Sequence, residues 1–183
     1  MRMRWSKLRS ALLERVAPSL RDRLAVHQAR YRRTQEEVGR VWITLDGREL
    51  ISFDTNRYVA KRARIEYDMR SGAGPLASSA QSNMTEYHAA DRAAADYLRR
   101  AGEYDDYSAL QDLEAYLSLP IEEALVSPSP LLRGLAVVDR RVGKRRLRKL
   151  GEQRDEHPFV QALCAARCAA EGINSGGEAD SHS

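Results

Sequence analysis

The sequence predicts an α+β protein in which a small antiparallel sheet in the N-terminal part packs against a mostly helical C-terminal half. A β-hairpin pattern around Asp46-Gly47 and the helical spacing of apolar residues after residue 84 both point to this class. With 183 residues, of which 43% are hydrophobic and 31% charged, the chain is typical of a single globular domain.

The predicted organisation is one domain over residues 1–171, followed by a disordered tail over residues 172–183. Residues 1–70 hold a helix and the sheet, residues 71–84 form a loop or linker, and residues 85–171 form the helical part. The stretch SGAGPLASSAQSN, at residues 71–83, is small and polar and is interrupted by Gly and Pro, which favours a loop.

The first element is a helix over about residues 7–16, which Ser6 can cap and Pro18 ends. Its apolar residues at helical spacing are Leu8, Leu12, Leu13 and Val16. Residues 23–31 fit the first strand, because apolar and polar side chains alternate there.

The hairpin over residues 40–54 is the clearest local prediction. Asp46-Gly47 suits a two-residue type I′ turn, because both central residues of that turn need a positive φ. The resulting register pairs Ile43 with Leu50 and Trp42 with Ile51. Both faces of the hairpin are then apolar, so we expect helices or a second subunit to cover both.

Residues 58–68 fit a further strand, which extends the predicted sheet over about residues 23–68. The rest of the chain is predicted to be helical. The expected helices cover about residues 85–101, 106–118, 120–126, 131–150 and 157–171. His157, directly before Pro158, is expected at the start of the last of these helices.

Charge is segregated along the chain. The net formal charge is +9 over residues 1–64, −8 over residues 65–130 and +3 over residues 131–183, which gives +4 in all. Such a chain can neutralise itself on folding or on association with another copy, so the pI near 9.2 does not by itself indicate nucleic-acid binding.

The most informative stretch is residues 131–150, LLRGLAVVDRRVGKRRLRKL. Seven of the ten residues from Arg140 to Lys149 are cationic. On one helix, the apolar residues occupy one half and most cations the other, with Lys149 at the edge. The outward cations that we take as candidate anion-binding residues are Arg140, Arg141, Lys144, Arg145 and Arg148.

Two residues of this stretch violate the pattern. Asp139 and Arg146 fall within the apolar half, two turns apart, with Gly143 between them. They can form a buried ion pair, in which each charge is costly without its partner. Alternatively the helix breaks, and Asp139 caps a second helix that starts at Arg140.

Weaker candidates lie elsewhere. Tyr31 with Arg32 can stack on a base beside a phosphate. His88 with Asp91 can form an acid/base pair, although a solvated helix face is the more ordinary interpretation. The two cysteines, Cys164 and Cys168, are expected to be small buried residues rather than metal ligands. The sequence contains no nucleotide-binding or hydrolase motif, so it predicts no catalytic residue, metal or cofactor.

Three segments carry a family resemblance: MRWSKL at residues 3–8, GRVWITLDGREL at residues 39–50, and RGLAVVDRRVGKRRL at residues 133–147. They resemble a family of uncharacterised bacterial proteins of about this size that also occur on mobile elements. The resemblance runs from the start of the chain to about Leu150, and it implies no activity.

Three functions remain open at this point. The first is a non-catalytic binding or regulatory protein whose basic helix contacts nucleic-acid phosphates. The second is a homo-oligomeric module with self-complementary acidic and basic surfaces. The third is an enzyme or binding protein that holds a small anion between sheet and helices, with Arg140, Arg141 or Arg146 as ligands. The sequence has no apolar run of ~20 residues and no apolar signal-peptide core, so we expect a cytoplasmic protein without a membrane partner.

Overall fold

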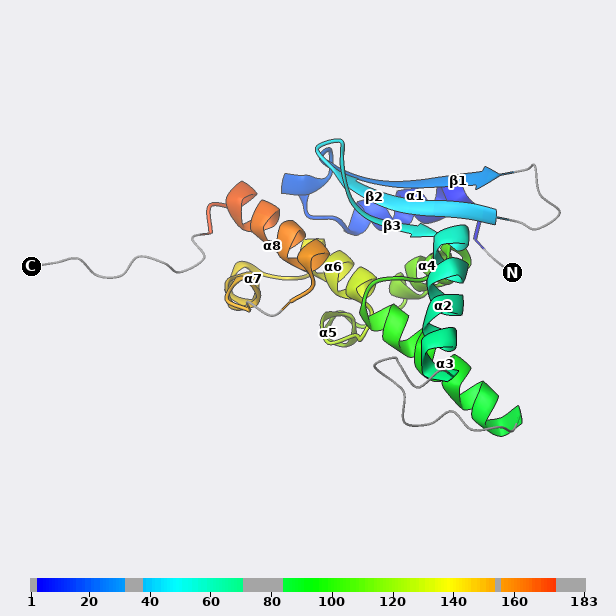
Figure 1. Cartoon of the computed structure of the whole chain (residues 1–183). Helices are drawn as coiled ribbons and strands as arrows, with labels where there is room; N and C mark the ends of the chain where they lie inside the picture. The colour runs from blue at the N-terminus through cyan, green and yellow to red at the C-terminus, as the bar shows by residue number, and fades with distance from the viewer. Residues whose placement is uncertain (1–2, 32–37, 71–83, 154–155, 174–183) are drawn as a thin grey trace, which may run out of the picture.

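The computed structural model describes residues 3–31, 38–70, 84–153 and 156–173, and it has the predicted α+β class (Figure 1). The antiparallel sheet has the order β1-β2-β3. Its strands are β1 (Leu24–Tyr31), β2 (Val38–Leu45) and β3 (Arg48–Asp54). The helices are α1 (Trp5–Arg15), the short 3-10 helix η1 (Pro18–Leu20), α2 (Thr55–Arg70), α3 (Met84–Arg100), α4 (Asp106–Tyr116), α5 (Ile121–Leu125), α6 (Pro130–Val138), α7 (Lys144–Gly151) and α8 (Pro158–Ala170).

The hairpin turn is as predicted, but its register is not. Asp46 and Gly47 have φ values of 52° and 78°, as a type I′ turn requires. The predicted pairs Ile43–Leu50 and Trp42–Ile51 are wrong, because the register shifts between Ile43 and Thr44 and Ile43 pairs with Ile51. Leu50 is the extra residue of this β-bulge.

The bulge decides which face of the sheet joins the core. It turns Ile51 and Phe53 to the same side as their partners Ile43 and Val41, and all four side chains are buried. The other side, expected to be covered, keeps Trp42 partly exposed. In Figure 1 the helices α4, α6 and α8 lie beneath the sheet on the core side.

The predicted strand over residues 58–68 is wrong, since these residues belong to α2. Asp54 accepts a hydrogen bond from the backbone N of Arg57 (3.0 Å), which caps the start of the helix. The buried Tyr58 and the partly buried Ile65 lie two turns apart, so helical burial outweighs their preference for strands.

Apart from the helix over residues 131–150, the other predicted elements are found with boundaries shifted by at most two residues. The N-cap of α1 is Arg4 without a side-chain hydrogen bond, so the predicted Ser6 cap is wrong. His157 is the N-cap of α8, as predicted, and its side chain accepts from the backbone N of Phe159. Ile173 is buried and donates to the carbonyl of Cys168, so order continues past residue 172. The segment 71–83 and the rest of the tail lie outside the described residues.

The helix α6 lies at the centre of the core, and α8 packs directly against it. A Cβ on Gly134 would lie 2.2 Å from Cε1 of Phe159, a distance that real contacts do not reach. Gly134 therefore sets how closely the two helices approach. None of the helices in the described residues is long and apolar enough to cross a membrane.

Replacing Gly134 with alanine is expected to lower the free energy of unfolding by about 1–3 kcal/mol, because the Phe159 ring and α6 must shift apart. Urea denaturation followed by circular dichroism measures this change. Gly143→Ala is the matched control, since its Cβ would meet nothing within 4 Å. A Gly134→Ala variant as stable as the control would show that α6 and α8 are not in close contact.

Candidate functional site

The basic stretch 131–150 is not one helix. It divides into α6 and α7, joined by the turn at residues 139–143. A break is thus observed, but the second helix starts at Lys144 with Gly143 as its N-cap, not at Arg140 with Asp139 as its cap. Asp139 instead forms the C-cap of α6.

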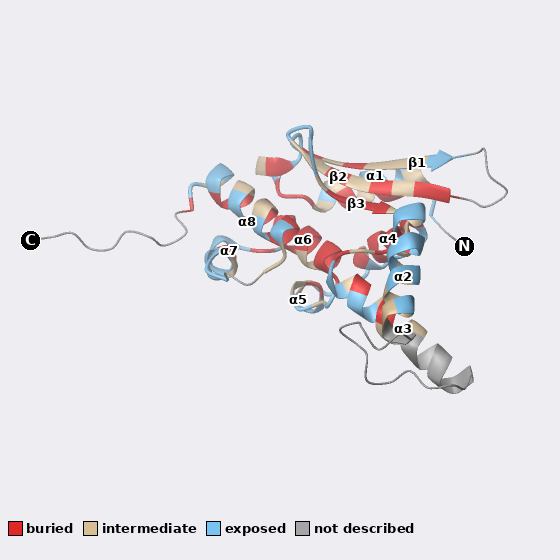
Figure 2. Cartoon of the chain, viewed as in Figure 1, coloured by how far each residue is buried: buried red, intermediate tan, exposed pale blue. Residues whose placement is uncertain are grey.

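The two helices differ sharply in burial. Figure 2 shows α6 as almost wholly buried and α7 as mostly exposed. Leu147 is the buried residue of α7 and packs on the side of α8, where the Sγ of Cys164 lies 4.0 Å from its carbonyl oxygen. The helix α7 is therefore held by Leu147 and by the partly buried Leu150, and its cations lie on the solvent side.

The side chain of Asp139 holds the turn together. Its two oxygens accept from Nε (2.9 Å) and Nη2 (2.8 Å) of Arg141, and Oδ1 also accepts from the backbone N of Arg141 (2.8 Å). Tyr116 of α4 donates its hydroxyl to Oδ2 (2.6 Å). The predicted Asp139–Arg146 pair does not form, because the break removes the alignment of the two residues and Arg146 pairs with Glu122 (2.5 Å).

Electrostatics favour the ionised form of Asp139, which is only 1% exposed. Burial by itself raises the pKa of its carboxyl, but the hydrogen bonds from Arg141 and Tyr116 outweigh it and the pKa lies below the ordinary value. Burial and the bond to Asp139 raise the pKa of Tyr116. Both groups thus keep fixed protonation states near neutral pH, as a structural role requires.

Arg167 of α8, to which the sequence assigned no role, completes the turn. It is 3% exposed, and its guanidinium donates to the carbonyl oxygens of Val137 (2.6 Å), Asp139 (2.7 Å) and Val142 (2.6 Å). These include the free carbonyls at the C-terminus of α6, which a cation stabilises. One feature of the sequence could have pointed to this role: Arg167 lies four residues after Leu163, on the apolar face of the predicted helix.

The turn is also joined to α1. The backbone N of Arg140 donates to the carbonyl of Arg15 (2.8 Å), and that of Ala17 donates to Val138 (2.8 Å). Because α1, α4 and α8 all bond to it, the turn has little freedom, and the start of α7 is fixed relative to the core.

We call the exposed cations of the turn and of α7 that pair with no described carboxylate the basic surface. Its members are Arg140, Lys144, Arg145, Arg148 and Lys149. Arg141, a predicted anion-binding residue, is not a member because it pairs with Asp139. Arg146 is excluded by its pair with Glu122. Lys144 donates to the carbonyl of Glu171 (3.3 Å). Across residues 3–31, 38–70, 84–153 and 156–173, none of the five forms an ion pair with a carboxylate. Like charges at i,i+3 and i,i+4 each cost about 0.2–0.5 kcal/mol, so a bound anion would stabilise α7.

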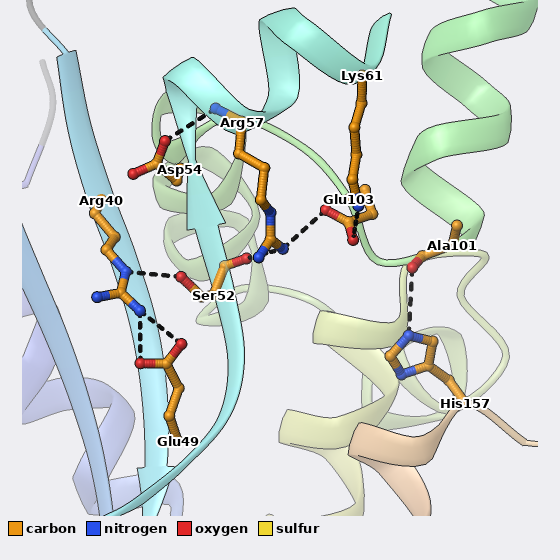
Figure 3. Close-up of polar contacts among 9 residues, drawn as sticks. All are labelled: Arg40, Glu49, Ser52, Asp54, Arg57, Lys61, Ala101, Glu103 and His157. Carbon is orange, nitrogen blue, oxygen red and sulfur yellow. Dashed lines mark hydrogen bonds and ion pairs between the residues drawn. The ribbon is translucent and has the colours of Figure 1, made fainter. Parts of the chain in front are cut away.

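The acidic middle of the chain is paired largely with other cations. Glu103 accepts from Arg57 (2.9 Å) and from Lys61, both on α2 (Figure 3). Burial raises the pKa of Glu103, but its two cationic partners lower that pKa by more, so the pKa lies below the ordinary value. Further pairs join Arg62 to Asp91 and Arg99 to Asp112. The segregated charges thus meet within one copy, and in the described residues the acidic middle reaches α7 through Glu122 only.

Two further polar groups appear in Figure 3. Arg40 on the outer face of the sheet binds both carboxylate oxygens of Glu49 (2.6 Å each) and the hydroxyl of Ser52 (2.8 Å). His157 faces the carbonyl of Ala101 (3.3 Å) while it caps α8, and burial lowers its pKa. Each of these groups is satisfied by its neighbours, so neither indicates a ligand.

The weaker candidates do not join the basic surface. Tyr31 is 46% exposed at the end of β1, which Figure 1 places at the opposite end of the molecule from α7. Arg32 and the side chain of His88 lie outside the described residues. Cys164 and Cys168 are buried free thiols, and burial together with Cys168 raises the pKa of Cys164 to about 12.

Comparison with known proteins gives one match. The model of the SF0329 protein family matches residues 4–168, a span that includes α1, the turn and α7. No curated protein and no solved structure matches the chain.

Proposed function

The chain belongs to the SF0329 protein family, and we propose that it binds nucleic acid non-catalytically, by contact of its basic surface with backbone phosphates. The observation that supports this is the exposure of Arg140, Arg145, Arg148 and Lys149 without a carboxylate partner in the part of the chain that the structure describes. Arginine side chains recognise phosphate through paired N–H donors, so this residue choice suits such contacts.

The geometry of α7 suits phosphate rather than bases. Arg145, Arg148 and Lys149 lie at i, i+3 and i+4, so they share one face of a single short helix. The N-cap Gly143 has no side chain to cap the helix, so the first N–H groups of α7 have no side-chain acceptor at this position. Contacts of this kind position a protein on nucleic acid and carry no sequence information, so binding should be non-sequence-specific.

The salt dependence follows from the number of contacts. If four cations each neutralise one phosphate of duplex DNA, the slope of log affinity against log salt is about −3.6. Affinity then falls roughly 100-fold between 50 and 200 mM salt. A flat salt response would contradict phosphate binding directly.

The test compares two quadruple variants of equal charge. In Arg140→Gln/Arg145→Gln/Arg148→Gln/Lys149→Gln, binding to a labelled 20-base-pair duplex should weaken strongly and the magnitude of the salt slope should fall by about 3.6. The matched control, Lys7→Gln/Arg48→Gln/Arg64→Gln/Arg100→Gln, removes three arginines and one lysine that are exposed elsewhere and should bind nearly as the parent does. Fluorescence anisotropy over a salt series measures both.

The alternative homo-oligomer predicts a different result. Light scattering after gel filtration would show an oligomer for the parent and a lower molar mass for the first variant. Neither the parent nor either variant would bind the duplex. Equal binding by both quadruple variants would show that total charge, not the basic surface, attracts DNA.

A further inference from the structure

We infer that the phosphate-binding surface does not end at the turn but continues to Arg21, beside the C-terminal end of α1, so that its partner is a length of nucleic-acid backbone rather than an isolated phosphate. This inference rests on the proposed function. It concerns a segment that is more than a hundred residues from α7 in sequence and that the fold brings to the same place.

The backbone of α1 and that of the turn lie in direct contact. Val16 and Asp139 form an isolated antiparallel bridge. The backbone N of Arg140 donates to the carbonyl of Arg15 (2.8 Å). Arg140 is therefore fixed beside the last residues of α1.

Arg21 contacts the same segment of backbone. Its Nη2 faces the carbonyl oxygens of Glu14 (3.4 Å) and Val16 (3.5 Å). Both bonds are long, Arg21 is exposed, and among the described residues it forms no ion pair. Two arginines thus approach residues 14–16 of α1, and neither charge is neutralised by a described carboxylate.

The dimensions indicate a partner that extends over several phosphates. The three residue-to-residue steps from Arg140 to Gly143 span at most about 10 Å. The rise of α7 from Lys144 to Lys149 adds about 7.5 Å. The two lengths together amount to at most about five successive phosphates of one strand, which are spaced by 3.4 Å along the duplex axis. Arg21, on the α1 side of Arg140, lengthens the surface further.

The experiment measures the salt slope for the 20-base-pair duplex with the full-length chain. Arg21→Gln/Arg140→Gln should reduce the slope by about 1.8, or 0.9 for each lost phosphate contact, and weaken binding at low salt. The matched control, Arg48→Gln/Arg64→Gln, should leave the slope unchanged. Arg21→Lys/Arg140→Lys should retain the parent slope, because lysine still neutralises phosphate.

The outcomes separate this inference from the proposed function. If Arg21→Gln/Arg140→Gln loses only about 0.9 of the slope, the loss that the proposed function already expects for Arg140, then Arg21 contacts no phosphate and the inference is wrong. If the lysine variant loses as much as the glutamine variant, Arg21 and Arg140 act by supporting α1 and the inference is also wrong. If the parent itself does not bind the duplex, the proposed function fails as well.

Discussion

Replacing Arg167 with methionine is expected to lower the free energy of unfolding by about 3–5 kcal/mol, the largest single loss we expect for this chain. Methionine fills much of the space of the side chain but donates no hydrogen bond. The carbonyl oxygens of Val137, Asp139 and Val142 then lose the guanidinium that joins α6 and the turn to α8. Equilibrium urea denaturation measures the loss.

The controls for this variant test its cause. Arg64→Met, on the exposed face of α2, should change stability by less than about 0.5 kcal/mol. Arg167→Lys should recover only part of the loss, because one ammonium group cannot span three carbonyls as a planar guanidinium does. If Arg167→Met were as stable as the parent, we would conclude that water solvates these carbonyls in the variant and that the turn does not depend on its hydrogen bonds to α8.

The hairpin shows how far local sequence determines a sheet. Asp46-Gly47 specifies the turn, because few residues other than glycine, asparagine and aspartate accept its positive φ values. The bulge at Leu50 has no such local signal. Ile51 and Phe53 alternate equally well on either face, and their burial against the helices selects the shifted register.

The wrong strand at residues 58–68 has a related cause. Aromatic and β-branched residues there favour a strand, and helical spacing is visible only when Tyr58 and Ile65 are known to be the buried pair. Asp54 was an available signal for a helix start, since aspartate is a strong N-cap residue, and its carboxylate does cap α2.

The candidate site was predictable in its charges but not in its contacts. The cations that the helical pattern placed outward are exposed, and so is Arg146, which the pattern had placed in the apolar half. That pattern also marked Asp139 as unusual. Its partner was assigned wrongly because a helical wheel assumes an unbroken helix. Tyr116 and Arg167 come from helices 23 and 28 residues away, and only tertiary packing brings them to the turn.

This division bears on function. The geometry of the turn comes from three buried groups, Asp139, Tyr116 and Arg167, whose hydrogen bonds go to other parts of the chain. The exposed cations depend on that turn for their position but contribute little to its stability. Variants of the buried groups should therefore alter folding first, and variants of the basic surface should alter binding without altering folding.

Replacing Asp139 with asparagine is expected to lower the free energy of unfolding by about 1–3 kcal/mol at pH 7, because it removes the buried carboxylate that accepts hydrogen bonds from Arg141 and Tyr116. The loss should depend on pH. The pKa of Asp139 is lower in the folded chain than its ordinary value of 3.8, so the unfolded chain takes up the proton first as the pH falls. The stabilisation by the carboxylate is thus fully present above that ordinary value and disappears as the pH falls through the lower, folded pKa.

The measurement is the difference in unfolding free energy between parent and Asp139→Asn from pH 7 to pH 2. This difference in unfolding free energy should be constant from neutral pH to about pH 5 and should become smaller below pH 4. Tyr116→Phe, which removes the hydroxyl shared by Asp139 and the carbonyl of Leu135 but keeps the carboxylate, should be less destabilised and should retain the acid dependence of the parent. Asp46→Asn removes the carboxylate of an equally well-aligned pair with Arg23, but one that is exposed, and should change stability little. Equal losses for Asp139→Asn and Asp46→Asn would contradict the argument, because burial is what distinguishes the two pairs.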